Sequence, residues 1–321
     1  MSGRAPMPPG TPPGPDLPAV GEVVVIDGGL ATELEARGHD LSDRLWSARL
    51  LRDDPAAIEA VHAAYFGAGA RVATTASYQA TVEGFAAVGV GRDDALALVR
   101  RSVELARRAR DRAASRAAAG GDLRPRLVAG SVGPYGAMLA DGSEYTGGYD
   151  LTEAELVAFH RPRAEALLEA GADLLAFETI PSVAEGAALV RLLDELPGAR
   201  AWLSFQCRDG ERTARGEPIE EAVAIAAGHP RIVAVGVNCT APGDLPSLLA
   251  RIAGVTDLPR IAYPNAGRGW DAESRTWLAP DGAPFDPATT ASWRGLGATW
   301  LGGCCGVGPS GIAALASRLA G

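Results

Sequence analysis

Short apolar runs recur along the chain, and each is followed by a longer segment in which apolar residues return every three or four positions. The runs consist mainly of valine, isoleucine, leucine and alanine. Runs of this kind are typical of strands that are buried on both faces. We expect eight such strands, at residues 23–26, 71–75, 127–131, 173–178, 201–205, 232–237, 260–263 and 299–301.

The segments between these runs predict helices. In the segment 55–66, Ile58, Val61 and Tyr65 fall on one helical face, and glycines follow it. Thr152 and Glu155 form a capping-box pattern at the start of another helix. We expect helices at 31–37, 55–66, 93–118, from 152 onward, and at 183–196, 218–227, 244–253 and 287–296.

The unbroken alternation of strand and helix sets the fold class. It predicts parallel strands joined by crossover helices, and eight units in about 300 residues match the size of a (β/α)8 barrel. A doubly wound open sheet is the competing fold, but it usually carries a glycine-rich phosphate loop after its first strand. Asp27-Gly28-Gly29 is not that fingerprint. We therefore predict the α/β class and a (β/α)8 TIM barrel.

The first twenty residues differ from the rest. They are rich in proline and glycine and contain no apolar run long enough for a signal peptide or a membrane span. We interpret 1–20 as a disordered or extended tail and 21–321 as the barrel domain.

The chain of 321 residues has a formal net charge of −9, which argues against a general nucleic-acid binder. The chain has no lysine, so arginine is its only strongly basic residue. The arginines between Arg100 and Arg126 lie at helical spacing, which is typical of a solvated helix face. The chain has four cysteines, and its sequence shows no targeting segment or membrane span. We therefore expect a reducing, cytoplasmic location and no nucleic-acid or membrane partner.

In a barrel, the residues that follow the strands gather at one mouth, where active sites lie. The polar residues at these positions are Asp27, Ser77, Tyr78, Ser131, Glu178, Asn238, Cys239, Asn265, Cys304 and Cys305.

Three of these residues are thiols. Cys239 follows the sixth strand, and Cys304 and Cys305 follow the eighth, between glycines that permit a sharp turn. Three thiolates suit Zn²⁺, and three protein ligands rather than four leave a coordination position open. Buried free cysteines and a strained disulfide remain alternatives on spacing alone. Cys207 is interpreted as an ordinary core residue.

Several ordered motifs closely resemble those of the homocysteine S-methyltransferases. The similarity extends from about residue 22 to the end, and is closest to the branch that uses S-methylmethionine or, less well, S-adenosylmethionine. The motifs are Asp27-Gly28-Gly29 with Ala31-Thr32-Glu33-Leu34-Glu35, Thr75-Ala76-Ser77-Tyr78-Gln79-Ala80, Ser131-Val132-Gly133-Pro134-Tyr135-Gly136, Glu178-Thr179, Gly236-Val237-Asn238-Cys239 and Gly302-Gly303-Cys304-Cys305.

The resemblance implies a zinc-dependent barrel enzyme that methylates homocysteine to methionine, with Cys239, Cys304 and Cys305 as metal ligands. It implies that Glu178, assisted by Asp27, holds the homocysteine ammonium group, with an ordinary ion pair or helix cap as the alternative. The zinc-bound substrate thiolate is the expected nucleophile, and no side chain is expected to act as a general acid or base. The expected substrate-binding residues are Asp27, Gly28, Gly29, Trp46, Ser77, Tyr78, Tyr135, Glu178 and Asn238.

Each of the other substrate-binding residues has an alternative role. Gly28 and Gly29 offer backbone N–H groups to a carboxylate or form a simple tight turn. Trp46, Tyr78 and Tyr135 face a sulfonium cation or pack in the core. Asn238 orients substrate or caps a helix.

Departures from the family pattern leave the donor open. Ala266 and Arg268 stand where this branch often has serine and glutamate, and Gly306 stands where relatives often have arginine. Two alternative functions also stay open: a methyltransferase for selenocysteine or another thiol, and a binding protein with a structural zinc that has Cys207 as fourth ligand. The sequence predicts no oligomeric state.

Overall fold

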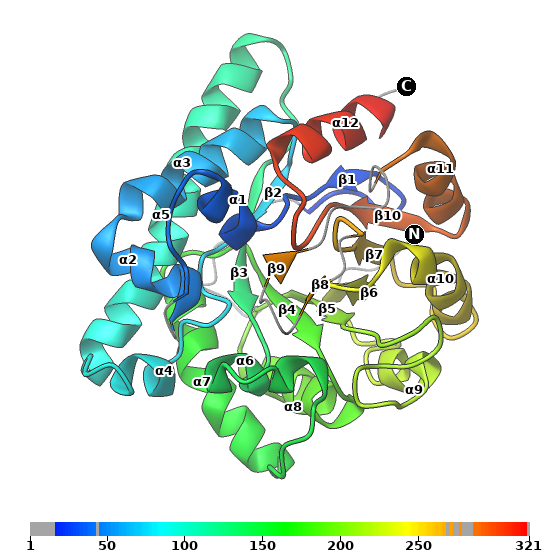
Figure 1. Ribbon diagram of the computed structural model, residues 1–321. Coiled ribbons are helices and arrows are strands. Elements are labelled where there is room, and N and C mark those ends of the chain that lie inside the picture. The colour runs from blue at the N-terminus through cyan, green and yellow to red at the C-terminus, as the bar shows by residue number, and fades with distance from the viewer. Residues whose placement is uncertain (1–16, 43–44, 268–269, 272–275, 278–284, 320–321) are drawn as a thin grey trace.

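The computed structural model describes residues 17–42, 45–267, 270–271, 276–277 and 285–319. Figure 1 shows a ring of strands enclosed by helices. The strands of the ring are β1 (Val24–Val25), β2 (Val72–Thr74), β3 (Leu127–Val132), β4 (Leu174–Ile180), β5 (Ala201–Phe205), β6 (Ile232–Asn238), β7 (Arg260–Tyr263) and β10 (Ala298–Leu301).

The eight strands form one parallel sheet in the order β1-β10-β7-β6-β5-β4-β3-β2. The two ends of this order meet, because the Arg71 N–H donates to the Val25 carbonyl at 2.7 Å and the Asp27 N–H donates to the Val72 carbonyl at 3.0 Å. The sheet is therefore closed, and the predicted (β/α)8 barrel is confirmed.

Helices connect the strands on the outside. The predicted capping box is present at the start of α7, where Thr152 and Glu155 bond each other's backbone. The helices are α1 (Leu30–Ala36), α2 (Leu50–Asp53), α3 (Pro55–Gly67), α4 (Val82–Ala86), α5 (Arg92–Ala119), α6 (Tyr135–Leu139), α7 (Glu153–Glu169), α8 (Val183–Glu195), α9 (Ile219–Ala224), α10 (Leu245–Ala253), α11 (Pro287–Gly295) and α12 (Pro309–Leu319), with 3-10 turns η1 (Trp46–Arg49), η2 (Ser143–Tyr145) and η3 (Pro242–Asp244).

The structure contains several elements that the predicted alternation of strands and helices does not include. A two-stranded antiparallel ribbon, β8 (Trp270–Asp271) with β9 (Thr276–Trp277), is inserted between β7 and α11. The short helices α4 and α6 and the turn η2 lie in the loops that follow β2 and β3. These additions lengthen the loops at the carboxyl ends of the strands, where the predicted site residues lie.

Alternation along the strands separates the barrel interior from the surrounding core. Leu174 and Ala176 of β4 belong to the interior cluster with Trp202, whereas Leu175 and Phe177 belong to the layer between strands and helices. Because side chains alternate along a strand, Glu178 continues the interior row and lies inside the barrel at the carboxyl end of β4.

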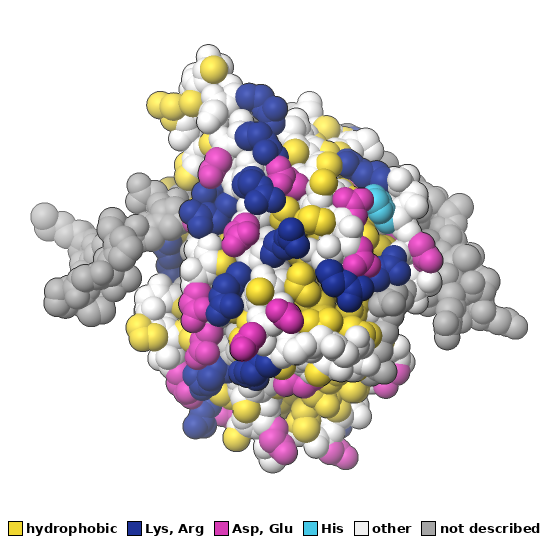
Figure 2. Space-filling model, turned by 90° about the vertical axis from the view of Figure 1, so that its left-hand side faces the viewer, with side chains coloured by type: hydrophobic (Ala, Val, Ile, Leu, Met, Phe, Trp, Pro, Cys, Tyr) yellow, Lys and Arg dark blue, Asp and Glu magenta, His cyan; other side chains and the backbone are white. Residues whose placement is uncertain are grey.

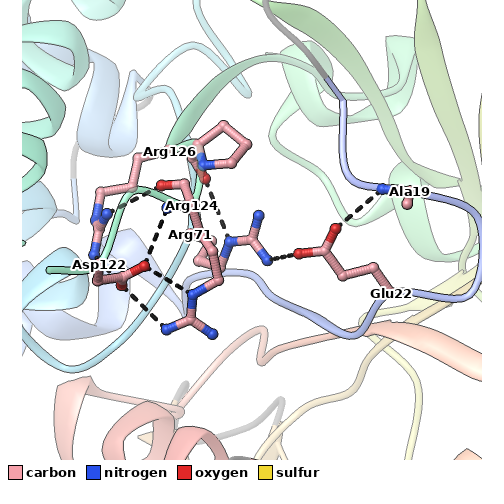
Figure 3. A network of polar contacts seen from close by, with 7 residues as sticks. Ala19, Glu22, Arg71, Asp122, Arg124 and Arg126 are labelled. Carbon is pink, nitrogen blue, oxygen red and sulfur yellow. Dashed lines mark hydrogen bonds and ion pairs between the residues drawn. The ribbon is translucent and has the colours of Figure 1, made fainter. Parts of the chain in front are cut away.

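The opposite end of the barrel holds the chain that precedes β1. Glu22 forms an ion pair with the buried Arg71, and its carboxylate accepts a hydrogen bond from the Ala19 N–H at 3.0 Å (Figure 3). Leu17 packs against the interior cluster. The chain is therefore attached to the barrel from Leu17 onward, and the predicted tail lies outside the described residues up to position 16.

The Arg-rich segment lies mainly on α5, on the outside of the barrel, as predicted. Figure 2 shows arginines interspersed with acidic side chains on this side of the molecule. Arg108 and Arg112 both pair with Glu59, and Arg100 pairs with Glu169 at 2.8 Å. Within the described residues, the helices include none that combines the length and the apolar character needed to cross a bilayer.

Candidate active site

Three sulfur atoms meet at the carboxyl ends of β6 and β10. Cys239 Sγ lies 3.0 Å from Cys304 Sγ and 3.8 Å from Cys305 Sγ. The three sulfurs all lie within 4.8 Å of one another. Since β7 is the only strand between β6 and β10 in the sheet order, the thiols of the sixth and eighth barrel strands are neighbours across the seventh, as the sequence predicts.

Local backbone geometry makes this convergence possible. Cys239 has a left-handed backbone with φ of 51°, which turns its side chain out of the regular strand alternation. After β10, the Gly303 N–H donates to the Asp27 carbonyl at 3.0 Å and the Cys304 N–H donates to the Pro264 carbonyl at 2.8 Å. The loop that carries Cys304 and Cys305 is thereby fixed between the ends of β1 and β7.

The three thiols interact strongly. Hydrogen bonds from Cys239 and then Cys304 hold the pKa of Cys305 well below its usual range. The pKa of Cys239 is raised by the hydrogen bonds of Cys239 with Cys304 and Cys305 and by burial. The shifts have opposite directions because the three sulfurs lie within hydrogen-bonding distance of one another, and a cation among them would favour the thiolate form.

The donor set fits a soft metal ion. Zn–S bonds of about 2.3 Å in tetrahedral geometry place sulfurs about 3.8 Å apart. Cys239 and Cys305 have this separation, whereas Cys239 and Cys304, at 3.0 Å, would move apart to hold the ion. Among the described residues, no other group of histidine, cysteine or acidic residues has metal-binding spacing. Cys207 lies outside the group, its side chain is buried, and its N–H donates to Thr240 Oγ1 at 3.0 Å. The position of Cys207 therefore gives no support to a four-cysteine site.

Glu178 is an acceptor that the barrel itself holds in place. Its carboxylate accepts hydrogen bonds from Ser131 Oγ and, at 3.2 Å, from the Tyr263 hydroxyl. Tyr263 is in turn held by Trp202 Nε1 at 3.0 Å. Burial raises the pKa of Glu178 to about 7, although the hydrogen bond from Ser131 opposes this. A cationic ligand would favour its ionised form.

Asp27 lies at the end of β1. Its carboxylate accepts hydrogen bonds from the Thr74 N–H at 2.8 Å and the Thr74 hydroxyl at 3.1 Å. Burial, and also the charge of Glu178, raises the pKa of Asp27 well above its usual range. The interior therefore brings two acidic groups near each other, and both would gain from a nearby ammonium group.

The two glycines after Asp27 differ in what they offer a ligand. The Gly29 N–H donates to the Val307 carbonyl at 3.0 Å, so it is already engaged. This leaves the Gly28 N–H as the candidate donor of the pair within the described structure. A Cβ added to Gly28 would lie 2.2 Å from the Val307 carbonyl oxygen, and one added to Gly29 would lie 2.6 Å from that of Cys304. Both positions need glycine because the loop after β10 packs directly on them.

Ser77 and Asn238 are fully buried, and their side chains bond to the protein. Ser77 Oγ donates to the Ser131 carbonyl at 2.7 Å. The Asn238 amide bonds Thr179 and also accepts from Ser204 Oγ at 2.8 Å. These contacts fit residues that position the strand ends, and a direct contact of either with substrate stays a prediction.

The predicted aromatic residues fall into two groups. Trp46 and Tyr78 lie edge to face with centroids 6.3 Å apart. Tyr78 is close enough to the thiols that Cys239 and Cys304 contribute, after burial, to raising its pKa. Tyr135 instead packs 5.1 Å from Tyr149 and 4.9 Å from Phe159. Tyr78 therefore lies near the thiols with Trp46 packed against it, and Tyr135 packs between the loop after β3 and α7.

Sequence reasoning missed a buried polar network beneath this loop. Glu185 of α8 accepts from the Tyr135 N–H at 2.7 Å and bonds His160 Nε2 at 2.8 Å. Arg163, on α7 with His160, donates to the carbonyls of Tyr78 at 2.6 Å and Gly133 at 2.5 Å. The sequence did contain a signal for this network. His160 and Arg163 lie three positions apart on a helix face that otherwise buries apolar residues.

Known proteins resemble this chain along most of its length. The family profile described as "Homocysteine S-methyltransferase" matches residues 24–319. The homocysteine S-methyltransferase of Escherichia coli is 49% identical over 302 residues, covering 92% of this chain and 95% of its own. The selenocysteine Se-methyltransferase of Brassica oleracea is 44% identical over 316 residues, covering 94% of this chain and 90% of its own.

A solved structure agrees with these sequence matches. The metallated form of the Escherichia coli homocysteine methyltransferase MmuM superimposes with a TM-score of 0.82 at 47% identity, over 92% of this chain and 96% of that one. Its fold is thus shared with the barrel in Figure 1.

Proposed function

This chain belongs to the homocysteine S-methyltransferase family, and from that premise we propose that it transfers a methyl group from a sulfonium donor to homocysteine, using Zn²⁺ held by Cys239, Cys304 and Cys305. The observation that carries the proposal is the convergence of these three sulfurs at the carboxyl face of the barrel. The reaction would yield methionine.

The metal assignment is supported by the chemistry of the donor set. The related MmuM has been solved in a metallated form, and three thiolates favour zinc over harder cations. When bound, zinc would keep the homocysteine sulfur as a thiolate at neutral pH, because Cys239, Cys304 and Cys305 would supply only three of its ligands.

Homocysteine would be oriented by groups at the ends of β1 and β4. Glu178 would accept hydrogen bonds from its ammonium group, and Asp27 would add a second negative charge close by. The Gly28 N–H would donate to its carboxylate. Because Ser131 and Tyr263 already fix the Glu178 carboxylate, little side-chain freedom would be lost on binding.

The donor would approach from the mouth, beside Trp46 and Tyr78. Aromatic faces attract a sulfonium cation by about 0.5–2 kcal/mol each when water is excluded. The thiolate attacks the methyl carbon in line, the bond from that carbon to the donor sulfur breaks, and the opposite charges disappear together. No side chain needs to move a proton in this step, so positioning supplies the acceleration.

Donor and acceptor choice are finer questions. S-methylmethionine is the proposed donor, with S-adenosylmethionine as a weaker one. Ala266 is buried, and its N–H donates to the Cys305 carbonyl at 2.9 Å. Arg268 lies outside the described residues. Selenocysteine is the second candidate acceptor, because a relative at 44% identity is a selenocysteine methyltransferase. A cytoplasmic location would keep the thiols reduced.

A direct test supplies purified protein with homocysteine and, in parallel, S-methylmethionine, S-adenosylmethionine or betaine, and measures methionine. We expect turnover with the sulfonium donors and little with betaine. Repeating the assay with selenocysteine as acceptor measures the second candidate. Absence of methionine with all three donors, in protein that contains zinc, would contradict the proposal.

A further inference from the structure

Glu144 has a carboxylate oxygen that is buried and unused. It lies in η2, in the long loop that follows β3 at the mouth of the barrel. Its Oε2 atom is buried and has no hydrogen-bond partner, and no described cationic side chain forms an ion pair with Glu144. An acceptor left in this state costs free energy, so it calls for an explanation.

The position of Glu144 is fixed by the packing of its backbone. A Cβ added to Gly136 of α6 would lie 2.4 Å from the Glu144 nitrogen and 2.9 Å from its Cα. The adjacent Tyr135 is held by Glu185 through its N–H. The carboxylate of Glu144 is therefore carried on a loop whose backbone packs closely against Gly136, and its Oε2 atom is buried.

The surroundings of Glu144 connect it with the reaction site. Its charge acts on the hydroxyls of Tyr78, Tyr145 and Tyr149 and contributes to raising the pKa of each, after the larger effect of burial. The thiols Cys239 and Cys304 act on the same Tyr78 hydroxyl. Tyr78 therefore lies near both the thiol cluster and Glu144.

We propose that Glu144 binds the ammonium group of the methyl donor. The inference rests on the proposed function, since it assigns a contact for the donor at that same site. An ammonium group supplies N–H donors for the unused oxygen and a positive charge for a carboxylate that lacks a cationic partner. Glu144 is distinct from Glu178 and Asp27, which are assigned to homocysteine.

The ammonium group is a better partner for Glu144 than the sulfonium. The sulfonium loses its charge during transfer, so a carboxylate bound to it would stabilise the ground state more than the transition state and slow the reaction. The ammonium keeps its charge throughout. A carboxylate there improves donor binding without opposing the transfer, and the sulfonium is left to the aromatic rings.

The test is equilibrium binding of two sulfonium probes without homocysteine, so that no transfer takes place. S-methylmethionine has an ammonium group, and dimethylsulfoniopropionate has none. Titration calorimetry on the zinc-loaded wild type and Glu144→Gln would measure both dissociation constants. We expect the substitution to weaken S-methylmethionine about 10- to 100-fold and to change dimethylsulfoniopropionate by less than about twofold.

Two further variants keep the result interpretable. Asp150→Asn removes an exposed acidic charge from the same loop and should leave both probes unchanged. Glu144→Asp keeps the charge and should retain part of the preference for S-methylmethionine. Equal weakening of both probes, no change in either, or no binding of S-methylmethionine to the wild type would overturn the inference. Methionine formation is measured separately, so a failure of the proposed function is recognised by itself.

Discussion

The Asn238 side chain and Thr179 are joined by two hydrogen bonds: the Thr179 N–H donates to Asn238 Oδ1 at 2.7 Å, and Asn238 Nδ2 donates to Thr179 Oγ1 at 2.8 Å. Thr179 follows Glu178, and Asn238 precedes Cys239. Thr179 and Cys239 both have left-handed backbones, with φ of 61° and 51°. The Asn238 amide therefore links the ends of β4 and β6. These strand ends carry Glu178, a candidate substrate-binding residue, and Cys239, a candidate metal ligand.

Replacing Asn238 should disturb the positions of both Glu178 and Cys239. Asn238→Ala leaves the buried Thr179 N–H without its acceptor, so we expect a loss of about 1–3 kcal/mol in the free energy of unfolding. The left-handed backbones of Thr179 and Cys239 also lose the bonds that hold them in place. Weaker metal retention should accompany the loss of stability. Denaturant unfolding and metal analysis after dialysis measure these effects, and unchanged metal retention would show that Cys239 does not depend on this bond.

Gly29 offers a test of how the thiol loop is seated. In Gly29→Ala the new Cβ would lie 2.6 Å from the Cys304 carbonyl oxygen, so the loop must shift and metal affinity should fall by about tenfold or more. Gly67→Ala is the matched control, because nothing lies within 4 Å of its added Cβ. Competition with a chelator compares the two, and equal affinities would refute the expected shift.

The buried Arg163 should matter far more than its surface neighbour. Arg163→Met removes the donors to the Tyr78 and Gly133 carbonyls and a buried positive charge that acts on Glu185. We expect it to lower the free energy of unfolding by about 3–5 kcal/mol. Arg161→Met, on the same helix but partly exposed, should cost at most about 1 kcal/mol. Comparable losses in denaturant unfolding would contradict a structural role for the network.

His62 predicts how stability depends on pH. Burial lowers its pKa to about 4, and both ring nitrogens lack partners. The unfolded chain therefore binds more protons between about pH 6.5 and 4, so this contribution to stability is lost as pH falls through that range. It should amount to about 2 kcal/mol between about pH 7.5 and 5. His62→Leu should flatten the unfolding free energy over this range, and an unchanged slope would assign it to other groups.

The sequence was sufficient to predict the eight barrel strands and the neighbouring thiols. Apolar runs such as 232–237 reflect burial on both faces, and the parallel topology then brings Cys239 to Cys304 across one strand. The polar network of Arg163 and Glu185 could not be predicted in this way, because it depends on how α7 and α8 meet. The left-handed backbone of Thr179 was equally hidden, since a β-branched residue rarely adopts it.

The ribbon β8–β9 shows a different limit. Its strands have only two residues each, too few for a periodic pattern to be recognised. The free acceptor of Glu144 likewise appears only when neighbouring loops are in place, because its backbone packs closely against Gly136 of α6.

The most direct test of the central claim is zinc content measured together with methionine formation. It uses the wild type, the three single variants Cys239→Ser, Cys304→Ser and Cys305→Ser, and the control Cys207→Ser. We predict a single zinc per chain and turnover in the wild type and in Cys207→Ser, and loss of both in the other three. Zinc released by Cys207→Ser, or turnover that survives in the metal-free variants, would contradict an open three-cysteine site.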